Sequence, residues 1–99
     1  MKTADIPVQG GKIFPDVDAD GVVVTQPAAG LFKAFSATCT HRGCTLTSVS
    51  DGTINCPCHG ARYSIADGSV VQPGDGEYTP TWPLAVKKVT IAGDTITVS

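Results

Sequence analysis

The feature that most constrains this chain is the placement of its cysteines and histidines. All four cysteines and both histidines lie in two short runs, Cys39-Thr40-His41-Arg42-Gly43-Cys44 and Cys56-Pro57-Cys58-His59-Gly60. Within each run, one cysteine and one histidine are close enough for a tight loop to direct both at a single metal centre: Cys39 with His41, and Cys56 with His59. A fold that uses these side chains must bring the two runs together.

The residues alone leave several chemistries open. A Cys₂His₂ zinc site could use one cysteine and one histidine from each run, although the spacings suit zinc ribbons only loosely. A framework of disulfides alone is weaker, because Cys56 and Cys58 are too close to bridge comfortably and both histidines would have no role. A catalytic Cys–His pair is a third alternative, but nothing else in the sequence supports a nucleophile.

The two runs resemble the loops of the Rieske iron–sulfur family, in which two cysteines and two histidines hold a [2Fe–2S] cluster. The resemblance implies a cysteine pair on the inner iron and a histidine pair on the outer iron: Cys39 and Cys56, His41 and His59. In one branch of the family a disulfide ties the two loops together. Here the resemblance assigns that disulfide to Cys44 and Cys58.

Residues around the ligands carry further implications of the resemblance. Tyr63 matches a tyrosine whose hydroxyl bonds to a ligand-cysteine sulfur, and Ala61 stands where high-potential members have a serine that bonds to a bridging sulfide. Gly43 and Gly60 complete the two loop motifs. With one of two stabilising hydrogen bonds missing, the potential should lie below that of the quinol-oxidising members, within the Rieske range of about −150 to +300 mV.

Arg42 is a second departure from those quinol-oxidising members, which usually carry an apolar residue between the first histidine and the glycine. A cation at this position would be costly to bury unpaired. We therefore expect a redox protein partner with a polar or acidic docking surface. The alternative is that Arg42 simply points into solvent.

Composition favours an all-β domain. The 99 residues suffice for one domain, and 11 glycines and 7 prolines separate short runs rich in valine, isoleucine and threonine. The resemblance implies a Rieske-type antiparallel β-sandwich with a smaller cluster-binding sub-domain formed by the two loops. We expect the cluster-binding part at about residues 37–72 and scaffold strands within 4–36 and 84–98.

Local patterns predict the individual strands. Asp51-Gly52 is the strongest hairpin signal, so the two ligand runs should lie at the open end of one hairpin. Residues 72–83 look like a loop, in which Pro73 or Pro83 corresponds to the family's proline segment over the cluster. The expected strands span residues 4–8, 12–14, 22–25, 31–36, 46–49, 53–55, 62–64, 69–71, 84–91 and 95–98.

Charge and hydropathy limit the partners. A net charge of −2 with only 16% charged residues gives no basic field for nucleic acid. No apolar run approaches the roughly 18 residues of a membrane helix, so we expect no membrane insertion by this segment. We also expect the chain to be a monomer. The start Met1-Lys2-Thr3-Ala4 lacks the apolar core of a signal peptide.

The implied disulfide nevertheless favours an oxidising compartment. We therefore expect a periplasmic or cell-surface protein whose export or anchor segment is absent from this sequence, with a cytoplasmic location as the alternative.

The resulting functional hypothesis is one-electron transfer through one [2Fe–2S] cluster, by a small carrier or an electron-transfer domain. An isolated chain of this kind is not expected to catalyse bond chemistry, and a complete Rieske oxygenase would need further histidines for a mononuclear iron. The alternatives are the soluble part or small subunit of a quinol:cytochrome oxidoreductase or of a molybdenum-type oxidase. A structural zinc module is the remaining alternative.

Overall fold

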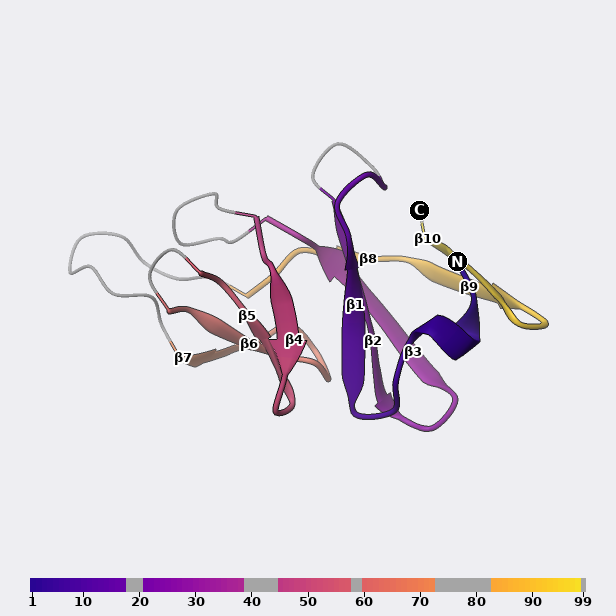
Figure 1. Ribbon diagram of the computed structural model, residues 1–99, viewed down its shortest axis with the longest axis horizontal. Helices are drawn as coiled ribbons and strands as arrows, with labels where there is room; N and C mark the ends of the chain where they lie inside the picture. Colours follow the sequence, from indigo (N-terminus) through magenta and orange to yellow (C-terminus); the bar gives the residue numbers. More distant parts are fainter. Residues whose placement is uncertain (18–20, 39–44, 58–59, 73–82, 99) are drawn as a thin grey trace.

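The computed structural model describes residues 1–17, 21–38, 45–57, 60–72 and 83–98, which form ten β-strands in three antiparallel sheets (Figure 1). The prediction of an all-β antiparallel fold is confirmed. Within these ranges the helical structure is a single 3₁₀ turn at Thr3–Asp5. No helix of the described residues is long and apolar enough to cross a membrane.

The middle layer, which we name the scaffold sheet, has the strand order β1-β2-β3-β8. Its long hairpin turns at Gly30, whose φ of 81° lies in the region that favours glycine. The ladder between β2 and β3 is irregular between Thr25 and Ala28. The strands are β1 (Gly10–Phe14), β2 (Val22–Ala28), β3 (Leu31–Ser36) and β8 (Val86–Lys87).

A second sheet, the loop sheet, is a meander of four consecutive strands: β4 (Ser48–Ser50), β5 (Thr53–Asn55), β6 (Arg62–Ser64) and β7 (Val70–Gln72). Its first turn is the predicted Asp51-Gly52, and both residues have positive φ, 53° and 79°. That pair of dihedrals is typical of the two-residue turns that match the twist of a hairpin. The hairpin prediction is therefore confirmed.

The third sheet is the hairpin of β9 (Val89–Ala92) and β10 (Thr95–Val98). The start of the chain lies along β10: Lys2 bridges Thr95, and the Ile96 N–H donates to the Met1 carbonyl at 2.7 Å. The two termini therefore meet at this side of the molecule, as Figure 1 shows.

Strand β2 is buried on both faces, which explains its unbroken valine run. Alternate side chains of a strand point to opposite faces. Val22 and Val24 pack with Ile96 on the side of the terminal hairpin, whereas Val23 packs with Ile54 on the side of the loop sheet. One strand thus contributes to two hydrophobic clusters.

Besides this hydrophobic packing, contacts of the segment that follows β6 join the loop sheet to the scaffold. The buried Thr25 Oγ1 donates to the Ile65 carbonyl at 2.7 Å. Gly68, with φ of 75°, lies against the Phe35 ring so closely that a Cβ would come within 2.9 Å of it. The Gly68 carbonyl also accepts the Leu84 N–H at 2.9 Å. The turn after β6 is therefore anchored to the scaffold through both side-chain and backbone groups.

Two predicted strands were wrong. Residues 4–8 do not form a strand, because Asp5 accepts the Lys2 N–H within the 3₁₀ turn and Gly10 donates to the Pro7 carbonyl. The expected strand 84–91 is two strands: β8 pairs with β3, and β9 pairs with β10. The change of partner falls at Lys88: the residues before it pair with the scaffold sheet, and the residues after it pair with β10.

Candidate metal centre

Backbone contacts join the residues on either side of the first cysteine–histidine run. Thr38 and Thr45 form an antiparallel bridge, and the Leu46 N–H donates to the Ala37 carbonyl at 2.7 Å. The Thr38 N–H also donates to Ser36 Oγ at 3.2 Å. These contacts hold Thr38 and Thr45, the described residues on either side of 39–44, next to each other shortly after β3.

The second run is closed in the same way. The Cys56 N–H donates to the Ala61 carbonyl at 2.9 Å, immediately beyond the paired Asn55 and Arg62 of β5 and β6. Gly60 has a φ of 76°, a conformation that glycine adopts without the Cβ penalty of other residues. Cys56 and Ala61 are therefore held next to each other at the end of the β5–β6 hairpin, on either side of residues 57–60.

The two loop bases lie beside each other. Ser48 pairs with Asn55 in the β4–β5 ladder, and the Thr47 N–H donates to the Asn55 carbonyl at 3.4 Å. Thr47 lies shortly after the first loop, and Asn55 precedes Cys56. Strand register therefore brings the exit of the first loop to the entrance of the second.

Beneath the loops lies a buried cluster that includes three residues singled out by sequence. Cys56 is 4% exposed, and Ala61 and Tyr63 are fully buried. They pack in one hydrophobic cluster with Leu46 and Ile54. The alanine offers no hydroxyl at its position, as the sequence predicted.

The remaining predicted site residues lie outside the described residues. They are Cys39, His41, Arg42, Gly43, Cys44, Cys58 and His59. The ligand set and the disulfide Cys44–Cys58 therefore stay predictions. So does the role of Pro73, whereas Pro83 is described and exposed.

Polar side chains on the outer face of β4 and β5 fix the strand that leads into Cys56. Asn55 Nδ2 donates to Ser48 Oγ at 3.2 Å and to Ser50 Oγ at 3.0 Å. The Thr53 hydroxyl donates to Asn55 Oδ1 at 2.7 Å. Every polar atom named here has a partner, so this network restricts the rotamer of the residue next to the buried cysteine.

Sequence reasoning missed Gln72, which contacts the second loop. Its Nε2 donates to the Gly60 carbonyl at 3.1 Å across 12 residues of sequence. The sequence prediction places Gln72 at the start of the loop 72–83, whereas in the structure it is the last residue of β7. No motif marks it, because the contact depends on an irregular register between β6 and β7.

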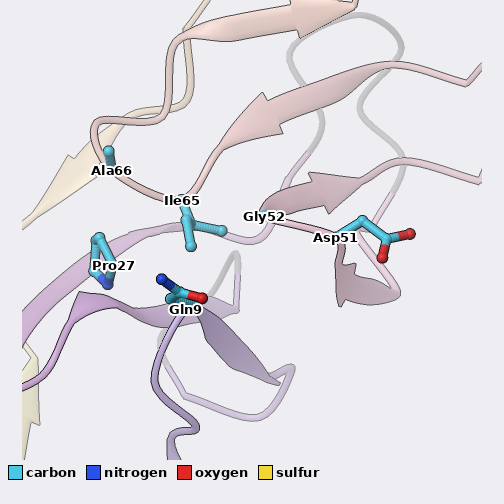
Figure 2. Close-up of a pocket in the computed structure, with 6 residues that line it drawn as sticks. All are labelled: Gln9, Pro27, Asp51, Gly52, Ile65 and Ala66. Atoms are coloured by element: carbon cyan, nitrogen blue, oxygen red, sulfur yellow. The ribbon is translucent and has the colours of Figure 1, made fainter.

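A surface groove of about 500 Å³ lies at the other end of the loop sheet. Figure 2 shows Gln9 and Pro27 of the scaffold side facing Ile65, with Asp51 of the β4–β5 turn nearby. Cys56 follows β5 at its opposite end. The groove is therefore separate from the loops that carry the cysteines and histidines.

The donor set fits an iron–sulfur cluster. Two adjacent loops each carry thiolate and imidazole groups, and the one thiol among the described candidates is buried against apolar side chains. Buried sulfur ligands beside more polar nitrogen ligands are the arrangement of a [2Fe–2S] centre with mixed ligation. Fold and donor set together define a β-protein of the mixed cysteine–histidine metal-centre class.

A family model described as the Rieske [2Fe–2S] domain matches residues 1–83, so the chain belongs to the Rieske family. The family resemblance drawn from the two loops is confirmed. As a Rieske domain the chain carries one [2Fe–2S] cluster, and such a cluster transfers one electron at a time. The structural zinc alternative is set aside by this membership.

Two curated relatives are named as iron-sulfur or Rieske subunits. The cytochrome b6-f complex iron-sulfur subunit of Chlorobaculum thiosulfatiphilum is 35% identical over 99 residues, covering 99% of this chain and 50% of the relative. A putative respiratory nitrate reductase subunit Rieske of Haloferax mediterranei is 36% identical over 72 residues, covering 72% and 32%. The chain thus spans a third to a half of the length of these relatives.

Solved structures share the fold. The cyanobacterial plasma membrane Rieske protein of Synechocystis has a TM-score of 0.68 and 28% identity, covering 84% of this chain and 80% of that one. A chain of the complex of reduced oxygenase and oxidized ferredoxin in carbazole 1,9a-dioxygenase has a TM-score of 0.72 and 23% identity, covering 99% and 96%. The Rieske-type architecture is confirmed by these likenesses.

Proposed function

We propose that this chain is a one-electron carrier or electron-transfer domain in which residues 37–72 hold the cluster. The proposed ligands are the two cysteines and two histidines named above: Cys39, Cys56, His41 and His59. Residues 4–36 and 84–98 serve as the scaffold, within one domain over 1–99. The observation that carries the proposal is the pair of closed loop bases that strand register sets side by side over the buried Cys56.

The protein's own residues supply the surroundings of the cluster. Leu46, Ile54 and Tyr63 exclude water from the inner side of Cys56, since all three are at most 1% exposed. The backbone clamps at Thr38/Thr45 and Cys56/Ala61 hold the loop ends at fixed separation. A rigid frame reduces the reorganisation that accompanies a change of charge, which favours electron transfer over ligand exchange.

Ligation is tested by spectroscopy of the purified protein. We expect visible absorption from the cluster and an electron paramagnetic resonance signal on reduction. Cys56→Ala should abolish that signal, because it removes a thiolate ligand. Cys44→Ser should still assemble a cluster, but a less stable one, since it removes only the proposed disulfide. A colourless wild-type protein, or a full signal in Cys56→Ala, would contradict the proposed ligation.

We propose a redox protein partner with a polar or acidic docking surface, met by a monomeric chain. Arg42 supports this choice, because a cation at this position suits a polar interface better than an apolar pocket. Arg42→Gln should slow electron transfer to an acidic partner several-fold at low salt. The difference should shrink as salt screens the charge.

The matched control is Lys88→Gln, which removes an exposed cation between β8 and β9. It should leave the rate nearly unchanged. Equal slowing by both variants, or a salt-independent effect of Arg42→Gln, would argue against docking at the loop that carries Arg42.

A second candidate function is the soluble part of a quinol:cytochrome oxidoreductase. The 35% identity to a cytochrome b6-f complex iron-sulfur subunit favours it. For both candidates we propose an extracytoplasmic location and a disulfide between Cys44 and Cys58. Thiol labelling of the protein under denaturing, non-reducing conditions tests the disulfide: labelling of two cysteines is expected, and labelling of four would favour the cytoplasmic alternative.

A further inference from the structure

The side chain of Gln72 reaches the end of the second loop. Its Nε2 donates to the Gly60 carbonyl at 3.1 Å. Gly60 directly follows His59 in the sequence and has a φ of 76°. Without a Cβ, glycine has wide conformational freedom, so a contact to its carbonyl restricts a peptide that the chain itself leaves free.

A β-bulge accounts for this reach. Arg62 pairs with Gln72, yet the next residue of β6, Tyr63, pairs with Val70. A regular antiparallel ladder would pair Tyr63 with Val71, so β7 holds one extra residue at this point. Bulges re-aim side chains and end pairing, and they occur often beside functional sites. Here the bulge leaves Val71 57% exposed and sets Gln72 against the loop.

The remaining anchors of the loop lie next to this contact. The Cys56 N–H is bonded to the Ala61 carbonyl, which fixes the entrance and the residue after Gly60. The Gly60 carbonyl is the acceptor between that clamp and His59. Gln72 therefore completes the closure of the loop on its exit side.

We propose that Gln72 is a positioning residue that holds the exit of the second ligand loop through Gly60. The inference rests on the proposed function, because it gives the loop's neighbouring cysteine and histidine the role of ligands. The amide is required rather than a polar group in general. A carboxylate of the same shape would place an unprotonated oxygen against the Gly60 carbonyl and repel it.

The experiment compares Gln72→Leu and the isosteric Gln72→Glu with Val71→Thr, the exposed neighbour on the same strand. Loss of cluster absorbance is followed in the presence of an iron chelator. Both Gln72 variants should lose the cluster about three- to tenfold faster than wild type, the range one hydrogen bond supports. Their reduced-state paramagnetic resonance should show shifted or broadened g-values, while Val71→Thr matches wild type in both measurements.

The result that overturns the proposal is a wild-type loss rate and spectrum in both Gln72 variants. A lower thermal midpoint of the cluster-free protein with unchanged g-values would equally overturn it, because that marks an ordinary stabilising contact. Failure of the proposed function is visible separately, in a wild-type protein that shows no cluster signal at all.

Discussion

At the scale of single residues, Ala61 leaves the second loop without a hydroxyl donor at a buried position. The residue is fully buried and its carbonyl accepts the Cys56 N–H at 2.9 Å. Ala61→Ser should raise the reduction potential, because a hydroxyl donor to sulfide stabilises the extra negative charge of the reduced cluster. Protein-film voltammetry measures the shift.

The control for this prediction is Ala66→Ser, which adds the same hydroxyl at an exposed turn. It should leave the potential unchanged. If Ala61→Ser also leaves it unchanged, its hydroxyl does not reach sulfide, and the correspondence between Ala61 and the family serine is wrong.

The residues near the centre differ in how far sequence alone could identify them. Cys56 belongs to the loop motif, and Ala61 and Tyr63 were singled out by the family resemblance; the structure places all three together in one buried cluster. Gln72 could not be predicted, because its contact depends on a one-residue change in register. Sequence patterns of period two indicate which face a side chain takes, but they do not locate a bulge.

At the scale of elements, the turn between β6 and β7 depends on Gly68. An added Cβ would lie 2.9 Å from Cδ1 and Cε1 of Phe35, and the φ of 75° is unfavourable for alanine. Gly68→Ala should therefore lower the free energy of unfolding by about 2–5 kcal/mol, from backbone strain and overpacking together. Chemical denaturation measures this change.

Gly30→Ala separates the two contributions. Gly30 has a φ of 81°, but a Cβ added there would meet nothing within 4 Å. This variant should lose only about 1–2 kcal/mol, the contribution of backbone strain alone. Equal losses in the two variants would contradict the proposed contact between the turn and Phe35.

The same turn contains an acidic residue with a local role. The hydroxyl of Ser69, followed by its backbone N–H, holds the pKa of Asp67 below its usual value. The Ser69 N–H lies 3.0 Å from Asp67 Oδ1. The ionised carboxylate thus supports the turn above its unfolded pKa, and that support is lost as pH falls through the lowered folded pKa.

Strand existence was easier to predict than strand partnership. The hairpin at Asp51-Gly52 followed from turn chemistry, since both residues tolerate positive φ. The run 84–91 reads as one strand because residues that favour strands lie on both sides of Lys87 and Lys88. Its division between two sheets depends on which neighbours are already present, β3 for one half and β10 for the other.

At the scale of the whole molecule, one buried hydroxyl joins two sheets. Thr25 Oγ1 donates to the Ile65 carbonyl at 2.7 Å across 40 residues of sequence. Thr25→Val keeps the shape but leaves that carbonyl without this donor, so stability should fall by about 1–3 kcal/mol. Cluster loss should accelerate as well, because the loop sheet is then less firmly attached.

Thr97→Val is the matched control, since Thr97 lies exposed on β10. It should change neither the denaturation midpoint nor the rate of cluster loss beyond experimental error. A Thr25→Val protein as stable as Thr97→Val would show that the inter-sheet hydrogen bond contributes nothing net.

The pairing of β3 with β8 has a consequence for how such proteins can diversify. The chain leaves β3 at Ser36 and returns at Ala85, and the Ser36 N–H donates to the Ala85 carbonyl at 2.9 Å. The two ends of the segment between these positions therefore lie side by side, so the segment is one insertion between two paired strands of the scaffold. A replacement segment would have to match the scaffold side chains that pack against it, which include Ile13, Val23, Thr25 and Phe35. Redox properties can then change while the host framework keeps its own strand order.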